Sequence, residues 1–199
     1  IRGVLEPAGG VVVEDPRAAV RTSLASPVAA PRLADMVDKA SSVALVIDDA
    51  SRPTPVDAIL PAVLEELKSG GVGNDQVTLI TALGVHRPMT RAEVEARIGG
   101  PLPEGMRWEN HDCDSADGLD YLGVTQRGTP VLVNQNVAQA DVIISIGCIE
   151  PHIIASFGGG YKNLIPGVAG RETIAHNHTL NCTPETFNMV GQPIDRNPM

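Results

Sequence analysis

Hydrophobic residues gather into three continuous runs of strand length, at residues 41–49, 76–84 and 140–147. None of the runs alternates with polar residues, which is typical of strands that are buried on both faces of a sheet. The three runs therefore predict central strands of a mostly parallel sheet.

Apolar residues at helical spacing follow the first two runs. Residues 56–71 have this spacing and end on two glycines that suit a helix C-cap. Residues 90–100 have it as well, and they open with Thr90 and Glu93 at the spacing of a capping box. Strands that alternate with helices predict an α/β fold, in which a mostly parallel, Rossmann-like sheet carries helices on both faces.

The other segments give weaker signals. We expect a short helix over residues 31–40 and short strands over residues 106–112 and 129–134. The stretch from Asp112 to Gly128 shows no clear period and is expected to form a surface loop.

The composition fits one globular domain. Of the 199 residues, 43% are hydrophobic and 20% are charged, which is enough apolar material for a sizeable core. We expect one domain over residues 1–190, with residues 191–199 starting a linker to a further domain. The net charge of -9 argues against a nucleic-acid partner or an anionic membrane surface, because both require clustered Lys and Arg.

The cysteines indicate the expected compartment. Cys113, Cys148 and Cys182 are scattered and lack C-x-x-C spacing, so they predict neither a disulfide framework nor a thiolate zinc site. The sequence shows no signal peptide and no apolar run of about eighteen residues that would span a bilayer. We expect a cytoplasmic location.

Ionisable residues follow each of the three apolar runs. In an open parallel sheet, ligands bind outside the carboxyl ends of the strands, where these loops emerge. The first loop, "DDASRPTP", holds Asp49 and Arg52 between the strand and two prolines that stiffen it. Arg52 suits a bidentate grip on a carboxylate or phosphate. Alternatively, Asp49 caps the next helix and pairs with Arg52 at the surface.

Two histidines come from the other two loops. "GVHRPMT" carries His86, and "EPHIIASFGGGYKN" carries His152, so a general acid and base could meet at one edge of the sheet. His152 follows a proline and is expected to begin a helix over residues 152–157. The positive end of that helix would disfavour the protonated imidazole.

Glycines and a lysine complete the third loop. Gly158, Gly159 and Gly160 allow positive φ or close approach to a ligand, and Lys162 follows them. The pattern is not a phosphate-binding Walker A loop, which needs Ser or Thr after the lysine. A glycine turn with a solvent-facing lysine is the alternative.

A further pair of histidines, His176 and His178, lies in "RETIAHNHT". An imidazole here could bind a metal, although no second ligand follows at the usual helical spacing of three or four residues. A three-histidine zinc site built from His86, His152 and His178 is possible, but it would leave Lys162 without a role.

Four motifs together resemble those of a known family. "DDASRPTP", "GVHRPMT", "EPHIIASFGGGYKNLIPG" and "TIAHNH" are similar, in the same order, to the signatures of the nickel-pincer-nucleotide-dependent lactate racemases. The resemblance runs from about Val43 to Asn197. It implies a two-domain α/β protein that interconverts the stereoisomers of 2-hydroxy acids. It also implies a pyridinium-derived mononucleotide that holds nickel through two sulfurs and a carbon.

The resemblance assigns roles to individual residues. It implies that Lys162 binds the cofactor covalently, with Gly158 to Gly160 making room for its flat ring, and that His178 is a ligand of the nickel. It implies that His86 and His152 form an acid-base pair on either side of the substrate. Finally, it implies that Asp49 and Arg52 line the substrate site.

The implied reaction is a reversible hydride transfer to the cofactor through a 2-keto acid. Direct removal of the C2 proton is difficult because that hydrogen, beside a carboxylate, is barely acidic. Hydride transfer, with a base taking the hydroxyl proton, avoids a carbanion and gives a planar intermediate. The implied partners are a small 2-hydroxy acid, the proteins that make the cofactor and the family's C-terminal domain, which is largely absent from this chain.

The sequence departs from the family pattern at two places. Tyr161 stands beside the lysine where some members have a basic residue, and "ASFGGG" replaces the commoner "AGFSGG". These departures leave the identity of the 2-hydroxy acid open, and without the C-terminal domain we expect weak or no turnover. Two other functions are alternatives: a zinc-dependent hydrolase, and a nucleotide-binding domain that has no catalytic activity.

Overall fold

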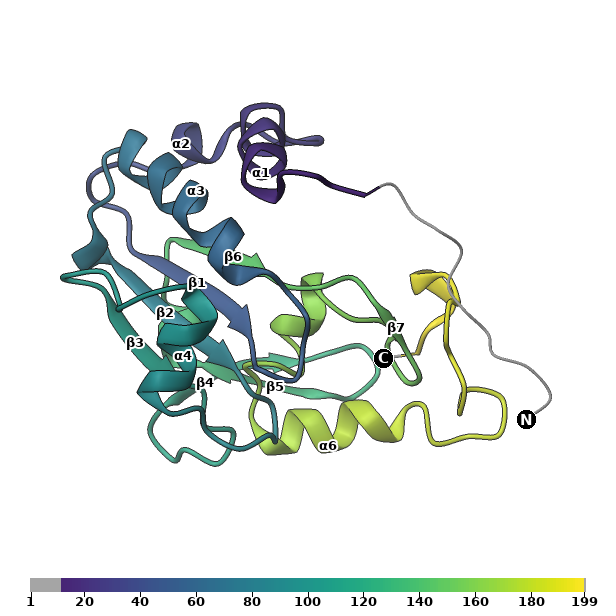
Figure 1. The fold of residues 1–199 in the computed structure, drawn as a ribbon. Helices are drawn as coiled ribbons and strands as arrows, with labels where there is room; N and C mark the ends of the chain where they lie inside the picture. The colour runs from purple at the N-terminus through teal and green to yellow at the C-terminus, as the bar shows by residue number, and fades with distance from the viewer. Residues whose placement is uncertain (1–11, 199) are drawn as a thin grey trace.

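The structure is a computed structural model that describes residues 12–198. Its centre is a four-stranded parallel sheet with the strand order β3-β2-β1-β6 (Figure 1). The strands are β1 (Val43–Asp48), β2 (Val77–Ala82), β3 (Arg107–Asn110) and β6 (Val142–Ile146). This sheet confirms the predicted α/β class, and each of the three predicted strands is present. β6 lies at an edge of the sheet with Ile143 exposed, so the expected burial on both faces is wrong for this strand.

The register aligns the carboxyl ends of β1, β2 and β6. Val43 pairs with Val77 on one side and with Val142 on the other, and both strand pairs are parallel. Because the three strands start level and have similar lengths, the loops that follow them leave from the same edge of the sheet.

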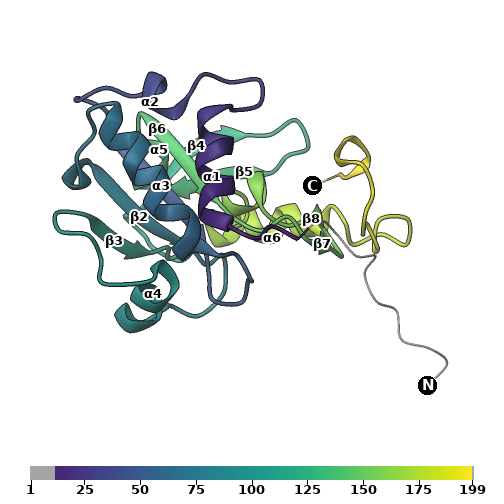
Figure 2. The same cartoon turned by 45° about the horizontal axis from the view of Figure 1, so that its top comes forward.

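Helices cover one face of the sheet. Every second residue of β1, namely Val43, Leu45 and Ile47, belongs to a core cluster with α3 (Val56–Ser69) and α4 (Arg91–Ile98). The capping box at the start of α4 is present as predicted. Figure 2 shows that α1 (Pro16–Ala25) lies on the same side as α3, which it contacts, and α2 (Leu33–Met36) also packs there.

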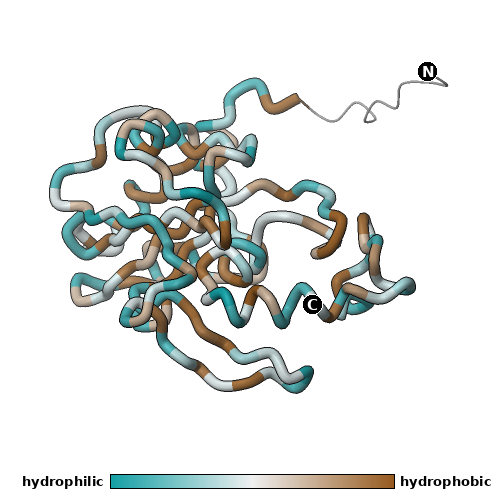
Figure 3. The backbone as a smooth tube through the Cα atoms, turned by 90° about the horizontal axis from the view of Figure 1, so that it is seen from below, coloured by the Kyte–Doolittle hydropathy of each residue, from teal (hydrophilic) through white to brown (hydrophobic). Residues whose placement is uncertain are grey.

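The opposite face buries Ala44 and Val46 of β1 against Val133 and Val137. Val133 belongs to β5 (Pro130–Asn134), and Val137 to the short helix α5 (Gln135–Ala138) that follows it. The sheet is therefore covered on both faces, which explains its continuous apolar runs. Along the backbone tube in Figure 3, hydrophobic segments run through the body of the molecule and hydrophilic ones are common in the outer loops.

A separate antiparallel ribbon corrects part of the prediction. The strand at 129–134 is present as β5, but it pairs with β4 (Leu119–Val124) and not with the main sheet. The expected loop from Asp112 to Gly128 is therefore wrong over β4. Tyr121, Leu122 and Val124 are all exposed, so this strand lacks the alternation of a half-buried strand.

The helix expected over residues 31–40 is shorter in the structure. It is limited to α2, because Val37 already has an extended backbone. The longer helix α1 before it was not predicted. It has no buried residue, and Val20 and Leu24 are its only large apolar side chains, although Asp15 caps it and Pro16 opens it.

The helix expected over residues 152–157 is wrong. The chain instead forms a small hairpin of β7 (Pro151–His152) and β8 (Ser156–Phe157). Ser156 has φ 67, a left-handed conformation that ends any helix, and its side chain is buried. The hairpin is followed by the turn η2 (Gly160–Asn163) and then by α6 (Arg171–Thr179).

Two further 3-10 turns complete the fold, η1 (Asn74–Gln76) before β2 and η3 (Ile194–Arg196) near the end of the chain. In the part of the chain that the structure describes, no helix has the length and apolar character needed to cross a membrane.

Candidate active site

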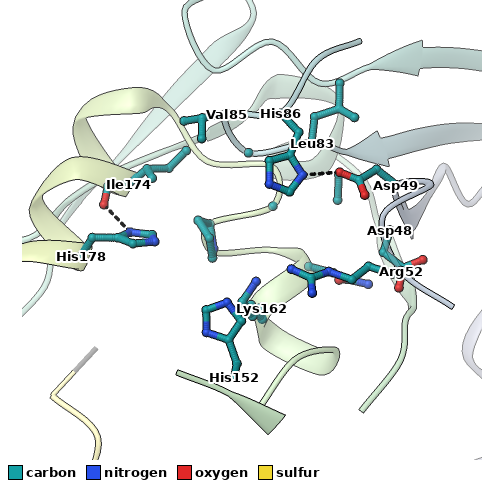
Figure 4. A pocket seen from close by; sticks show the side chains of 15 residues that line it. Asp48, Asp49, Arg52, Leu83, Val85, His86, His152, Lys162, Ile174 and His178 are labelled. Atoms are coloured by element: carbon teal, nitrogen blue, oxygen red, sulfur yellow. Dashed lines mark hydrogen bonds and ion pairs between the residues drawn. The ribbon is translucent and has the colours of Figure 1, made fainter. Parts of the chain in front are cut away.

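A pocket of about 140 Å³ opens at the carboxyl edge of the sheet. Its walls come from the loops after β1, β2 and β6, from η2 and from α6 (Figure 4). The predicted site residues that line it are Asp49, Arg52, His86, His152, Lys162 and His178. The structure thus brings together residues from motifs that span more than half of the chain.

Asp49 holds His86. The Oδ2 atom of Asp49 lies 2.5 Å from Nδ1 of His86, and its Oδ1 atom accepts hydrogen bonds from the amide and the hydroxyl of Ser51. Burial by itself raises the pKa of Asp49, but the hydrogen bonds from Ser51 and His86 outweigh it and hold the pKa below its ordinary value. The carboxylate is therefore ionised and accepts a hydrogen bond from Nδ1–H of His86, so that in the neutral ring Nε2 has a free lone pair.

Neither alternative for Asp49 is found in the structure. The residue at the start of α3 is Pro55, and no side chain caps that helix. Arg52 pairs with Glu150, which is 98 residues away, through an Nη1 to Oε1 distance of 2.5 Å. This ion pair joins the loop after β1 to the loop after β6, and both side chains are more than two-thirds buried.

A buried ion pair also holds these loops in place. The guanidinium of Arg97, on α4, pairs with the carboxylate of Asp48 and also donates to the backbone carbonyls of Asp48 and Arg52. The Asp48 carboxylate further accepts from the Thr54 hydroxyl at 2.5 Å and from the Cys148 amide at 3.3 Å. One carboxylate and one guanidinium therefore tie together β1, α4 and the loop after β6.

His152 lies across the pocket from His86 in the view of Figure 4. Burial is the largest cause that lowers its pKa to about 4, and the positive charges of Lys162 and Arg52 add to the effect. The predicted direction, a neutral imidazole, is confirmed. The predicted cause is wrong, because no helix begins at His152.

Lys162 is half-buried and faces the pocket, so a solvent-facing lysine is not what the structure shows. Burial lowers the pKa of its amine, and Arg52 lowers it further, while Glu150 and Asp49 act in the opposite direction. A lowered pKa increases the neutral, nucleophilic fraction of the amine.

His178 extends from α6 on a third side of the pocket (Figure 4). Its Nδ1 lies 2.7 Å from the carbonyl oxygen of Ile174, one helical turn earlier, so Nδ1 carries the proton and Nε2 has a free lone pair. His176 does not line the pocket, and its Nδ1 bonds with the Thr129 hydroxyl at 2.9 Å.

A three-histidine zinc site is not supported by this geometry. His86, His152 and His178 all line the pocket, but among residues 12–198 no three His, Cys, Asp or Glu side chains are grouped closely enough to hold a metal ion.

The three glycines lie beside the pocket. They line a larger, mainly apolar cavity of about 860 Å³, which shares Lys162 with the first. Gly159 has φ +73, and a Cβ atom there would lie 2.7 Å from the carbonyl oxygen of Cys148. Glycine is therefore required at this position by the chain's own backbone.

Sequence reasoning missed several residues of the site. The sequence analysis did not single out Asp48, Glu150 or Arg97. Asp48 offered a signal, because it is a charged residue at the end of an apolar strand and a buried charge without a partner costs free energy. Ile174 was missed as well. It lines the pocket and precedes His178 by four residues, so the helical period could have placed both side chains on one face of the helix.

A family model described as the lactate racemase N-terminal domain matches residues 1–188 of this chain. The chain belongs to this family. The match covers the motifs that were recognised in the sequence, and it includes every residue that we have placed in the pocket.

Two curated members of the lactate racemase family are similar to this chain. A lactate racemase of Thermoanaerobacterium thermosaccharolyticum is 28% identical over 180 residues, which is 90% of this chain and 42% of that protein. A lactate racemase of Lactiplantibacillus plantarum is 30% identical over 161 residues, or 80% of this chain and 38% of that protein. The chain therefore spans less than half the length of these relatives.

Solved structures support the fold assignment within the lactate racemase family. The lactate racemase apoprotein of T. thermosaccharolyticum superimposes with a TM-score of 0.81 and 29% identity, covering 92% of this chain and 45% of that one. A protein from Thermotoga maritima superimposes with a TM-score of 0.72 at 20% identity, covering 94% of this chain and 46% of that one, and this shows a shared fold.

Proposed function

We propose that this chain provides the cofactor-binding and acid-base part of a racemase of 2-hydroxy acids, with lactate as the first substrate to test. The observation that carries the proposal is the convergence of two histidines, an arginine and a half-buried lysine on one pocket. Membership of the lactate racemase family supports it.

The residues of the pocket fit the nickel-pincer nucleotide. Lys162 offers an amine whose pKa burial lowers, which suits a covalent bond to the cofactor. His178 offers an Nε2 lone pair, and its Nδ1–H is fixed by the Ile174 carbonyl, as is usual for a histidine that binds a metal. When bound, the cofactor supplies a hydride acceptor and donor for C2 of the substrate, so that the intermediate is a planar 2-keto acid.

Arg52 binds the substrate carboxylate in this proposal. A guanidinium has five N–H donors, and Glu150 accepts from only Nη1 of Arg52. The remaining donors suit a carboxylate, and the ion pair with Glu150 fixes the direction in which the guanidinium points.

His86 takes the hydroxyl proton. Its bare Nε2 accepts the proton, and the ionised Asp49 at Nδ1 stabilises the imidazolium that forms. His152 faces the same space from the other side, so that the oxygen of either enantiomer meets an imidazole.

Racemisation by the full-length protein, produced with the enzymes that make the cofactor, tests the proposal. L-Lactate is incubated with the protein, and D-lactate is measured by chiral chromatography. His86→Gln is expected to lower the rate by about 10²–10⁴-fold, the usual contribution of a general base. His176→Gln, on the same helix as His178 but outside the pocket, is the control and should retain the rate.

Equal rates for His86→Gln and the control would contradict the proposed role of His86. A loaded protein that binds the cofactor but racemises neither lactate nor other 2-hydroxy acids would favour the alternative of a nucleotide-binding domain without activity.

A further inference from the structure

The two catalytic histidines have different hydrogen-bond partners at Nδ1. In His86, Nδ1 lies 2.5 Å from a carboxylate oxygen of Asp49. In His152, Nδ1 accepts hydrogen bonds from two backbone amides, that of Ile154 at 3.2 Å and that of Ala155 at 3.0 Å. One ring therefore faces an acceptor at Nδ1, and the other faces two donors.

These partners decide where each neutral ring carries its proton. An ionised carboxylate only accepts, so Nδ1 of His86 must be protonated and Nε2 must be bare. A backbone amide only donates, so Nδ1 of His152 must be bare and Nε2 must be protonated.

We propose that His86 and His152 hold opposite tautomers, so that His86 presents a proton acceptor to the pocket and His152 presents an N–H donor. The assignment of this pair to a 2-hydroxy acid rests on the proposed function above; the tautomers themselves do not.

The hairpin that carries the two amides is held firmly in place. The carbonyl oxygen of Ile154 accepts from the side-chain amides of Asn181 at 2.8 Å and of Asn197 at 2.9 Å. Asn197 also donates to the Ser156 hydroxyl at 2.9 Å, and the Met189 amide donates to the Ile153 carbonyl at 2.8 Å. The amides at 154 and 155 are thus set by contacts that do not involve His152.

The two histidines are consequently unequal in the reaction. When the substrate hydroxyl faces His86, its O–H bond can break as an Nε2–H bond forms on His86; the cofactor, when bound, would supply the acceptor for the C2 hydride. When the hydroxyl faces His152, the imidazole N–H donates a hydrogen bond to the oxygen. To take the hydroxyl proton at Nε2, His152 must first adopt the other tautomer, with its own proton on Nδ1 and both amide hydrogen bonds broken; the O–H bond then breaks as the new Nε2–H bond forms.

This inequality has a kinetic consequence. The two enantiomers have equal free energy, so kcat/KM is the same in both directions. The individual values of kcat and KM need not be equal, and an unequal pair of histidines predicts that they differ between D- and L-lactate.

Nuclear magnetic resonance reads the tautomers directly. The chain is labelled with ¹⁵N-histidine, long-range ¹H–¹⁵N correlations are recorded at pH 7.5, and the rings are assigned with His86→Gln, His152→Gln, His176→Gln and His178→Gln. We expect His152 to show a protonated Nε2 in roughly tenfold excess or more, because the other tautomer loses two hydrogen bonds. His86 should show a protonated Nδ1.

A His152 ring protonated at Nδ1, or one that averages evenly between both nitrogens, would overturn the inference. Asp49→Asn serves as a matched control: it should release the preference of His86 and leave the signals of His152 unchanged. A simultaneous change in both rings would contradict the claim that each tautomer is set by its own partner.

The spectra need neither cofactor nor substrate. Failure of the tautomer assignment is therefore distinguishable from failure of the proposed racemase activity, which the lactate assay measures.

Discussion

At the scale of single residues, the chemistry of the site depends on how neighbouring groups set the protonation of its side chains. His86 and His152 are both imidazoles on loops of one pocket, yet an ionised carboxylate contacts one and backbone amides contact the other. Lys162 adds a half-buried amine whose pKa burial lowers. These are the conditions under which ordinary side chains become catalytic groups.

The lowered pKa of His152 predicts a pH dependence of stability. Its pKa falls from the ordinary 6.5 to about 4 on folding, chiefly through burial, so the folded state binds fewer protons than the unfolded state between these values. The contribution of His152 to stability is therefore complete above pH 6.5 and is lost as the pH falls toward 4.

Urea unfolding of the wild type and of His152→Gln, measured between pH 4 and pH 8, checks this. The free energy of unfolding of the wild type, minus that of the variant, is expected to decrease as the pH is lowered through this window. Because the difference is taken at each pH, the contributions to the free energy of unfolding from titratable groups present in both proteins cancel. A difference that stays constant with pH would show that His152 has an ordinary pKa.

The sequence placed most of the site residues but not their partners. Asp49, Arg52, His86, His152 and Lys162 were expected at one edge because the loops of parallel strands share that edge. Arg52 pairs with Glu150, 98 residues away, and Asp49 pairs with His86, 37 residues away. These pairings depend on the directions in which the side chains point in the folded protein. No local pattern encodes such directions.

At the scale of elements, the spacing of apolar residues predicted the buried helices and strands and missed the exposed ones. The strands β1 and β2 and the helices α3 and α4 carry strong apolar patterns because they build the core, and β6 contributes Ile146 to it. The exposed helix α1, the exposed strand β4 and the hairpin of β7 and β8 bury few apolar side chains, so a pattern of apolar residues could not reveal them.

The buried ion pair between Asp48 and Arg97 predicts a large loss of stability on Arg97→Met. The change leaves the carboxylate of Asp48 buried without its cation and removes two hydrogen bonds to loop carbonyls. The free energy of unfolding, measured by urea titration, is expected to fall by about 3–5 kcal/mol.

Arg91→Met is the matched control on the same helix. Arg91 pairs with Glu95 at the surface, where such pairs contribute less than about 1 kcal/mol. A loss of similar size in the two variants would contradict the view that α4 anchors the catalytic loops through Arg97.

At the scale of the whole molecule, this chain spans 42% and 38% of two lactate racemases that it resembles. The candidate pocket is built wholly from this part. We propose that the additional domain of such proteins closes the substrate cleft and adds contacts that select the 2-hydroxy acid.

Turnover by these 199 residues alone should therefore be low. The chain, loaded with cofactor, is compared with a full-length lactate racemase in the same chiral assay. We expect the isolated chain to form little or no D-lactate from L-lactate, because in this proposal the additional domain closes the cleft. Rates of similar size would show that the second domain is dispensable for catalysis.

The central claim is that Lys162 holds a nickel-pincer nucleotide, and intact mass spectrometry with nickel analysis tests it most directly. The chain is co-produced with the enzymes that make the cofactor, alongside the variants Lys162→Ala and Lys39→Ala. We predict an added cofactor mass and bound nickel in the wild type and in Lys39→Ala, with no added mass on Lys162→Ala. A cofactor mass that remains covalently attached to Lys162→Ala would contradict the account.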